Sequence, residues 1–276
     1  MRIRISHATT YRYDTPPNGV IQLLRLTPRN HDGQYVVSWR VEVSEECQLF
    51  QHEDAFGNIS HSFTAEGPFA ELTVAVEGEI ETHDTSGVVR GTVERFPPSM
   101  FLRETALTEA DAAIVDFAEG VRAGNSAEPL SLLHGLMTAL NREISFDTDP
   151  THSATTAAEA FALRRGVCQD LAHIFLASTR MYGIPARYVS GHFYRGDGVT
   201  SQDAGHAWVE AFVEGLGWVG FDPTNGIGTT EAHVRVAVAL DYLGAAPVRG
   251  TRFGGGGEIL KVAVHVDQAR RQVQNQ

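Results

Sequence analysis

Residues 164–183 read Arg-Arg-Gly-Val-Cys-Gln-Asp-Leu-Ala-His-Ile-Phe-Leu-Ala-Ser-Thr-Arg-Met-Tyr-Gly and predict a tight turn followed by a helix. The turn at Gly166 places Cys168 in the first helical turn, and Gly183 closes the helix. Apolar residues recur at helical spacing and predict one buried face: Val167, Leu171, Ile174, Phe175 and Met181. The free N–H groups and positive dipole end of a helix stabilise a thiolate, which makes Cys168 a candidate nucleophile. The alternative is a small buried hydrophobe, the usual role of a free cysteine.

The composition predicts a soluble globular protein. The 276 residues suffice for one large or two ordinary domains, with 42% hydrophobic and 20% charged residues. A formal charge of −12, with no run of lysine and arginine, argues against nucleic acid or an anionic membrane as a partner. The start of the chain has no apolar signal core, and no run reaches the length of a membrane span. Because two cysteines cannot form a disulfide framework, we expect a cytoplasmic location.

Residues 1–96 are expected to form an N-terminal β-sandwich domain. Residues 36–43 and 72–80 alternate apolar and polar side chains, and turn signals separate such segments. Cys47 lies in the acidic stretch Glu45-Glu-Cys-Gln-Leu, which would raise the pKa of its thiol. We therefore interpret Cys47 as structural.

Phe96-Pro-Pro-Ser marks the expected boundary, and residues 97–276 are assigned to a core that ends in C-terminal strands. Thr108 is expected to cap a first helix, Ser126 to start a second, and residues 155–163 to form a third. Strands are expected at the following places: 186–194, 206–213, 217–222, 234–238 and 259–266. The glycine run 254–257 precedes a strand rather than a helix, so we expect a hairpin turn and no phosphate site.

Three reactive side chains fall at the edges of expected elements. Cys168 begins a helix, His206 opens a strand, and Asp222 ends the next strand. The short turn at 214–217 joins these strands as a hairpin, which can place His206 and Asp222 side by side. If the cysteine helix packs across that end, the arrangement is that of a nucleophile, a base and an orienting carboxylate. Each residue also has a structural interpretation, Asp222 as the turn residue before Pro223 for example.

Four blocks resemble those of bacterial transglutaminase-like (papain-like) proteins. They are Gly166-Val-Cys-Gln-Asp, Gly183-Ile-Pro-Ala-Arg-Tyr-Val-Ser-Gly, Gly205-His-Ala-Trp-Val-Glu and Gly217-Trp-Val-Gly-Phe-Asp-Pro-Thr-Asn. The β-rich start is similar to the N-terminal domain that accompanies this core in one bacterial subgroup. The resemblance implies an α+β cysteine-protease-like core with Cys168 as nucleophile, His206 as base and Asp222 as orienter. It implies acyl transfer on an amide, and neither a metal nor an organic cofactor.

The sequence leaves open which residue donates the second hydrogen bond to the oxyanion. Animal transglutaminases that resemble this core use a tryptophan upstream of the nucleophile. The tryptophans of this chain are Trp39, Trp208 and Trp218. None of them lies between the boundary and Cys168, so the backbone N–H of Cys168 needs another partner donor. Candidates for this donor or for the cleft wall are Gln169, His152, Trp208, Tyr194 and His192.

Two polar residues on the cysteine helix are not assigned to catalysis. His173 lies about 140° around the helix from Cys168 and is expected in packing. Asp170, in the first turn, is expected to interact with the helix dipole. The 12 histidines show no pair on one helix with a carboxylate, so a zinc enzyme is not expected.

The favoured function is thiol-dependent hydrolysis of a peptide or isopeptide amide through a thioester, since no amine-binding slot is evident and water is the default acceptor. One alternative is a protein-glutamine transglutaminase or deamidase. Another is a binding or scaffold module with a vestigial triad, although a scaffold needs none of the three residues. The expected partner is a protein or peptide, and the net negative charge mildly favours a neutral or basic one.

Overall fold

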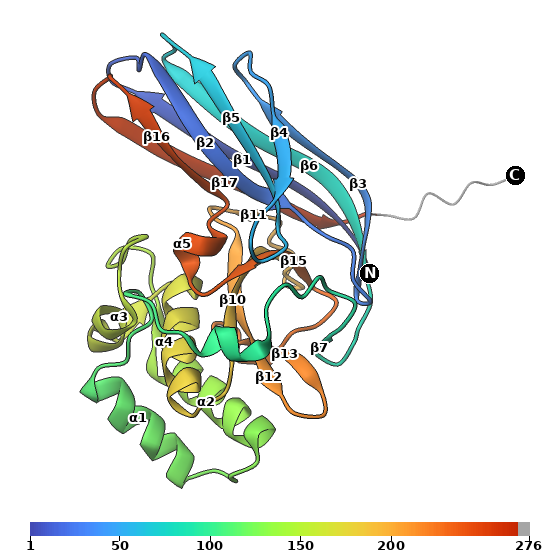
Figure 1. The fold of residues 1–276 in the computed structure, drawn as a ribbon, viewed down its shortest axis with the longest axis vertical. Coiled ribbons are helices and arrows are strands. Elements are labelled where there is room, and N and C mark those ends of the chain that lie inside the picture. The colour runs from blue at the N-terminus through green and yellow to red at the C-terminus, as the bar shows by residue number, and fades with distance from the viewer. Residues whose placement is uncertain (270–276) are drawn as a thin grey trace, which may run out of the picture.

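The computed structural model describes residues 1–269 as an α+β protein, in which a β-sandwich lies against a sheet covered by helices (Figure 1). The strands are β1 Arg2–Tyr13, β2 Gly19–Thr27, β3 Gln34–Val43, β4 Phe50–Glu53, β5 Ile59–Glu66, β6 Glu71–Thr82, β7 Val88–Val89, β8 Ser145–Phe146, β9 Arg165–Gly166, β10 Ala186–Phe193, β11 Ser201–Gln202, β12 His206–Val213, β13 Gly217–Asp222, β14 Ile227–Gly228, β15 His233–Ala239, β16 Val248–Phe253 and β17 Glu258–Gln268. The helices are η1 Pro98–Leu102, α1 Ala112–Ala123, α2 Pro129–Glu143, α3 Ala157–Leu163, α4 Cys168–Met181 and α5 Tyr242–Ala245. The expected architecture, an N-terminal β-sandwich followed by a cysteine helix packed on an antiparallel sheet, is confirmed.

The sandwich consists of two antiparallel sheets. Their strand orders are β11-β17-β1-β6-β3 and β16-β2-β5-β4. Strand β1 has one buried face, because exposed Arg2 and Arg4 alternate with buried Ile3 and Ile5. Tyr13, on the same face, lies in the apolar cluster between the two sheets, whereas the two isoleucines pack in a second cluster with Val234 of β15.

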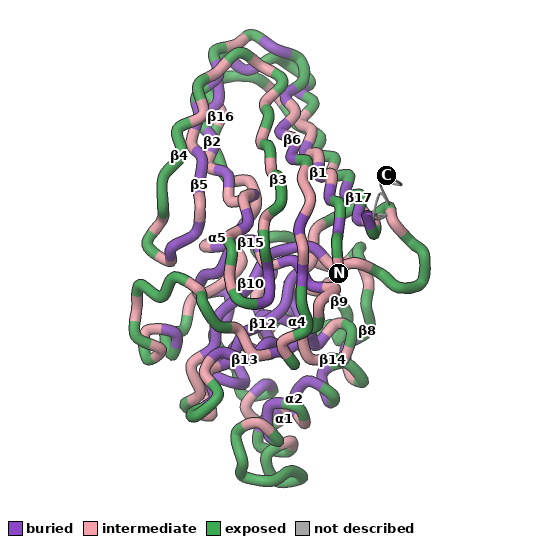
Figure 2. The backbone as a smooth tube through the Cα atoms, turned by 90° about the vertical axis from the view of Figure 1, so that its right-hand side faces the viewer, coloured by how far each residue is buried: buried purple, intermediate pink, exposed green. Residues whose placement is uncertain are grey.

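The core is built around α4, which lies against the sheet β14-β13-β12-β10-β15. Residues 170–180 of α4 are all buried, so the expectation of a single buried face is wrong. The reason is tertiary: α1, α2 and α3 pack against the side of α4 that the sheet leaves open. Figure 2 shows buried chain gathered around α4, β10 and β12. Gly183 follows α4 with φ +75°, as expected for a helix stop.

The expected strand 234–238 lies in the core sheet as β15, whereas the last two strands, β16 and β17, belong to the sandwich, which corrects their assignment to the core. β17 pairs with β1 over its whole length, from Ile3 opposite Gln268 to Tyr13 opposite Glu258. β16 pairs with β2. The glycine run 254–257 therefore links strands of two different sheets and is not a hairpin turn. The pairing is favoured because β1 and β2 would otherwise be sheet edges. The division of the chain at residue 96 itself stays a prediction.

Thr108 is a second correction. Helix α1 begins at Ala112, and its cap is Asp111, whose carboxylate accepts a hydrogen bond from the Ile114 N–H at 2.9 Å. Thr108 is fully buried, and its hydroxyl accepts a hydrogen bond from Arg180 Nη1 at 2.7 Å. Among residues 1–269, no helix is long and apolar enough to cross a membrane.

Candidate active site

Cys168 is the first residue of α4, and the turn before it is held by Asp170. The Asp170 carboxylate accepts hydrogen bonds from the Val167 N–H at 2.8 Å and from the Thr151 hydroxyl at 2.7 Å. Gly166 gives this carboxylate room, because an added Cβ would lie 2.5 Å from Asp170 Oδ2. Asp170 thus fixes the turn that presents Cys168, a role beyond the interaction with the dipole expected from the sequence.

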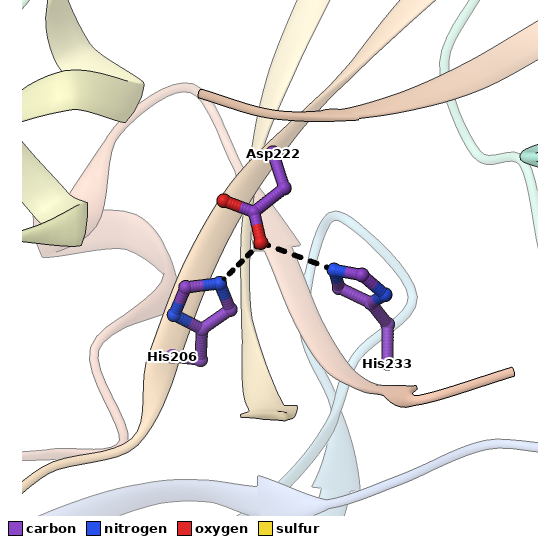
Figure 3. Close-up of side chains that lie close together, drawn as sticks. All are labelled: His206, Asp222 and His233. Atoms are coloured by element: carbon purple, nitrogen blue, oxygen red, sulfur yellow. Dashed lines mark hydrogen bonds and ion pairs between the residues drawn. The ribbon is translucent and has the colours of Figure 1, made fainter. Parts of the chain in front are cut away.

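The expected hairpin carries the histidine and the aspartate. β12 and β13 pair antiparallel, with Val213 opposite Gly217 and Val209 opposite Phe221. At the far end of this ladder, His206 Nε2 and Asp222 Oδ2 are 2.7 Å apart (Figure 3). The hairpin therefore brings the two side chains into contact by local geometry alone.

The His206–Asp222 pair is largely buried and charged. Burial by itself would lower the pKa of His206, but the charge of Asp222, its hydrogen bond and the nearby Cys168 side chain raise that pKa to about 10. Burial opposes ionisation of Asp222, yet the contacts with His206 and His233 lower its pKa far below the ordinary range. His206 is therefore an imidazolium and Asp222 a carboxylate at neutral pH, and His206 Nε2 donates to Asp222.

His233 is a second histidine on Asp222, and the sequence analysis missed it. Its Nε2 lies 3.1 Å from Asp222 Oδ2 (Figure 3), and its Nδ1 accepts a hydrogen bond from the Thr230 N–H at 3.0 Å. Because Nδ1 is an acceptor and burial lowers the pKa of His233, the ring is neutral with its hydrogen on Nε2, which donates to Asp222. The strand expected at 234–238 begins one residue after His233. The position of His233 beside the site depends on the pairing of β15 with β10, which the local sequence does not indicate.

The Asp222 carboxylate accepts further hydrogen bonds from its own loop. Oδ1 accepts from the N–H groups of Thr224 at 3.0 Å and Asn225 at 3.1 Å, and Oδ2 accepts from Asn225 Nδ2 at 2.6 Å. With the two histidines, five donors surround one fully buried carboxylate. Such a set fixes the orientation of Asp222 and supports its ionised form.

Two histidines and a carboxylate are also a ligand set for a metal ion. In the part of the chain that the structure describes, His206, Asp222 and His233 form the one group of three His, Cys, Asp or Glu residues whose ligand atoms lie within 4.8 Å of one another. A metal would need the lone pair of His233 Nε2, which carries the hydrogen because Thr230 donates to Nδ1. This arrangement fits a hydrogen-bonded triad better than a metal centre.

A cleft of about 810 Å³ opens beside the candidate triad. Cys168, His206, Gln169 and His192 all line it. The opposite wall comes from the sandwich, through residues that include Thr9, Tyr11, Leu260 and Val262. The site thus lies between the two halves of the fold, and a bound molecule would touch both.

Three candidates for the cleft are placed elsewhere. Trp208 is buried beneath the site, with its ring 6.1 Å from that of His206 and 5.2 Å from that of His233. Tyr194 packs against the apolar cluster around Ile3. His152 uses Nδ1 to accept a hydrogen bond from the Ala154 N–H at 3.2 Å, within its own loop. None of the three is among the residues that line the cleft.

The other two reactive side chains have structural positions. His173 is fully buried, and its Nε2 accepts a hydrogen bond from the Tyr242 N–H at 3.1 Å. Cys47 packs against the sandwich core, and partial burial, with the charge of Glu45, raises the pKa of its thiol. Both placements agree with the expectations from the sequence.

Comparison with known proteins finds similarity in both halves of the chain. Residues 3–81 match the bacterial transglutaminase-like N-terminal region, and residues 116–223 match the transglutaminase-like superfamily. An uncharacterized protein of Mycobacterium leprae is 31% identical over 279 residues, which cover 96% of this chain and 98% of that protein. A protein-glutamine gamma-glutamyltransferase of Pseudomonas aeruginosa is 28% identical over 144 residues, which cover 47% of this chain and 21% of that protein.

A solved structure shares the whole fold. The crystal structure of a proposed cysteine protease from Cytophaga hutchinsonii has a TM-score of 0.70 and 17% sequence identity, covering 99% of this chain and 92% of that one. The likeness therefore extends over the sandwich as well as the core.

Proposed function

Because the chain belongs to the transglutaminase-like superfamily, we propose that it is a thiol-dependent acyl-transfer enzyme that hydrolyses a peptide or isopeptide amide. Cys168 is the nucleophile, His206 the general acid and base, and Asp222 the residue that orients His206. The observation that carries the proposal is the buried Asp222–His206 pair at 2.7 Å, beside a cysteine at a helix N-terminus in the same cleft.

The proposed reaction has two stages. The Cys168 thiolate attacks the amide carbonyl, and the tetrahedral intermediate collapses to a thioester as His206 gives its proton to the leaving amine. Neutral His206 then takes a proton from water, the hydroxide attacks the thioester carbonyl, and the C–S bond breaks to release the carboxylic acid, which leaves the Cys168 thiolate and the His206 imidazolium as at the start. Asp222 keeps the ring oriented and stabilises the imidazolium in both stages.

The oxyanion needs hydrogen-bond donors near Cys168. The first N–H groups of a helix have no acceptor within the helix, so the Cys168 N–H is one proposed donor. Gln169 lines the cleft and is the second. Its Nε2 donates only a long hydrogen bond of 3.4 Å to the His152 carbonyl, which a developing oxyanion can replace.

An amine acceptor is the alternative to water. It would make the protein a transglutaminase or, with glutamine as donor and water as acceptor, a deamidase. The similarity to the Pseudomonas aeruginosa gamma-glutamyltransferase favours considering it. Release of ammonia with stable incorporation of a primary amine, and no cleavage of the peptide, would select the transglutaminase. A non-catalytic binding module is the third possibility, and it predicts that Cys168→Ser leaves every measurable function unchanged.

The first test is alkylation of each cysteine as a function of pH, read by mass spectrometry, in the wild type and in His206→Ala. Cys47 is an internal control, because the raised pKa of its thiol delays its reaction to higher pH. We expect Cys168 to react well below pH 8 in the wild type, roughly where a free thiol is still protonated, and to lose this reactivity in His206→Ala. Equal profiles for the two cysteines in the wild type would contradict the proposal.

A further inference from the structure

Strand β17 has a free edge beside the cleft. One edge pairs with β1 along the whole strand. On the other edge, β11 pairs only with His265 and Val264, and the Val266 N–H donates to the Thr200 carbonyl at 2.9 Å. Within residues 1–269, no strand pairs with this edge from Glu258 to Ala263.

The backbone groups of Leu260 and Val262 point to the free edge. The Val266 N–H faces β11, whereas the Gly257 carbonyl, an odd-numbered position, faces the β1 side and accepts from the Asp14 N–H at 2.9 Å. Since backbone groups alternate along a strand, the even-numbered Leu260 and Val262 direct their N–H and C=O away from β1. They offer two donors and two acceptors to an incoming strand.

The same two residues contribute their side chains to the cleft that holds Cys168. Leu260 is 54% exposed, so its apolar side chain is accessible to a bound molecule. The chain that pairs with β17 leaves the edge after Gln202 and supplies His206 four residues later. The free edge of β17 therefore begins at the point where the segment that leads to His206 stops pairing with β17.

We propose that this edge binds the substrate as an added β-strand, so that the substrate is an extended stretch of polypeptide with apolar side chains at alternate positions. The inference rests on the proposed function, and it adds the conformation and chemistry of the substrate. Backbone hydrogen bonds to Leu260 and Val262 supply affinity, and every second substrate side chain lies against the apolar wall at Leu260 and Tyr11. A helical or compactly folded segment cannot make these bonds.

A binding experiment with an inactive enzyme tests the edge directly. The background is Cys168→Ser, and the probe is a short fluorescein-labelled peptide that alternates valine and threonine around one glutamine, followed by fluorescence anisotropy. Leu260→Pro removes an N–H that faces the free edge and leaves the β1 ladder bonded. We expect it to weaken binding at least about fivefold, the effect of one hydrogen bond. The matched control Lys261→Thr changes a neighbour whose backbone faces β1, and it should bind as the background does.

A second series keeps the protein constant and methylates the peptide backbone one nitrogen at a time. Because an added strand directs only alternate N–H groups to β17, the loss of affinity should recur at every second position. Uniform or absent effects, equal binding by Leu260→Pro and the control, or no binding up to roughly 1 mM would each overturn the proposal. So would concentration-dependent dimerisation that Leu260→Pro abolishes, because a second copy would then be the occupant. Alkylation of Cys168 in the wild type reports on the proposed function separately.

Discussion

At the scale of single residues, the site is organised by the lone pairs of Asp222. Three donors meet at Oδ2, from His206, His233 and Asn225. Two of these contacts are with histidines in different protonation states, one held as an imidazolium by the carboxylate and one held neutral by burial and by Thr230. Asp222 therefore both raises the basicity of His206 and is restrained by His233.

Replacing Asp222 by asparagine should weaken the thiolate–imidazolium pair. The carboxylate charge is what raises the pKa of His206 to about 10 against the effect of burial, so Asp222→Asn lets that pKa fall. Each unit by which that pKa falls below the pH of the measurement reduces the imidazolium fraction, and with it the ion-pair population, about tenfold. We expect alkylation of Cys168 at pH 6 to slow by at least about tenfold. An unchanged rate would show that Asp222 does not act through His206.

Replacing His233 tests whether its hydrogen bond to Asp222 affects the pKa of His206 or only the stability of the fold. His233→Phe removes one donor to Asp222 and leaves the Thr230 N–H without its acceptor, which should reduce the free energy of unfolding by about 1–3 kcal/mol. With one donor fewer, the Asp222 charge acts more strongly on His206, so the pKa of His206 should rise. Titration of His206 by nitrogen NMR measures this shift. His233→Gln, which can donate and accept, should restore both quantities, and a purely structural role would leave the titration unmoved.

At the scale of elements, the cysteine helix is held at both ends. Asp170 fixes the turn before Cys168, and Arg180 anchors the last turn. The Arg180 guanidinium is buried and donates to the carbonyls of Phe101, Ala186 and Leu240 as well as to Thr108. Burial lowers the pKa of Arg180 to about 10, so it remains charged at neutral pH and needs these acceptors.

Thr108→Val therefore tests the anchor of the helix. The substitution keeps the shape of the side chain but leaves Arg180 Nη1 without its partner at 2.7 Å. We expect a loss of about 1–3 kcal/mol in the free energy of unfolding, measured by urea denaturation, and Thr108→Ser should retain most of the stability. A double-mutant cycle with Arg180→Met should show that the two side chains are energetically coupled, and strictly additive costs would contradict the anchor.

These elements also show what local sequence can predict. The start of the helix at Cys168, its stop at Gly183 and the hairpin that joins His206 to Asp222 are encoded within a few adjacent residues, and all were predicted. Thr108 looked like a cap because threonine followed by acidic residues has that local signature, whereas its true partner Arg180 is 72 positions away. His233 carries no local signature and contacts Asp222 only because β15 pairs with β10.

At the scale of the whole molecule, buried neutral histidines should make the fold sensitive to acid. Burial lowers the pKa of His7 to about 4, of His173 to about 4 and of His192 to about 3. Below pH 6.5 or so the unfolded chain protonates these residues and the folded chain does not, so stability falls as the pH falls. The contribution of His206 has the opposite sign: it is complete below about pH 6.5 and is lost only as the pH rises through about 10.

Urea denaturation at pH 7 and pH 5 measures this dependence. The slope for each of the three buried histidines is about 1.4 kcal/mol per pH unit at its steepest. His7→Gln should reduce the total slope, because it removes one of the three groups that the unfolded chain protonates first. A free energy of unfolding that is flat from pH 7 to pH 5 would show that these rings take up protons in the folded state. The ring centroids of His7, in the sandwich, and His192, in the core, are 5.5 Å apart. Protonation of these rings at low pH should therefore weaken the contact between the sandwich and the core.

Whether residues 1–96 form a folding unit alone is testable, because the sandwich also contains the C-terminal strands β16 and β17. Their assignment to the core followed their position in the chain, and nothing local in residues 248–268 indicates that β16 pairs with β2 or β17 with β1. If the sandwich needs these strands, residues 1–96 alone should aggregate, because one edge of each sheet then lacks its partner. Trp39, the one tryptophan in that fragment, reports on its packing by fluorescence.

Joining residues 247–269 to residues 1–96 through a glycine-serine linker should restore a monomer with cooperative unfolding in urea. A fragment 1–96 that is monomeric and cooperative without the added strands would instead show that the sandwich folds first and the C-terminal strands dock later. The two results predict different mobility for the edge of β17 that is proposed to bind the substrate. In the first case β17 is integral to the sandwich, so the edge at Leu260 is as rigid as the sheet. In the second case β17 can detach with the chain that leads to it, and access to the cleft would depend on its docking.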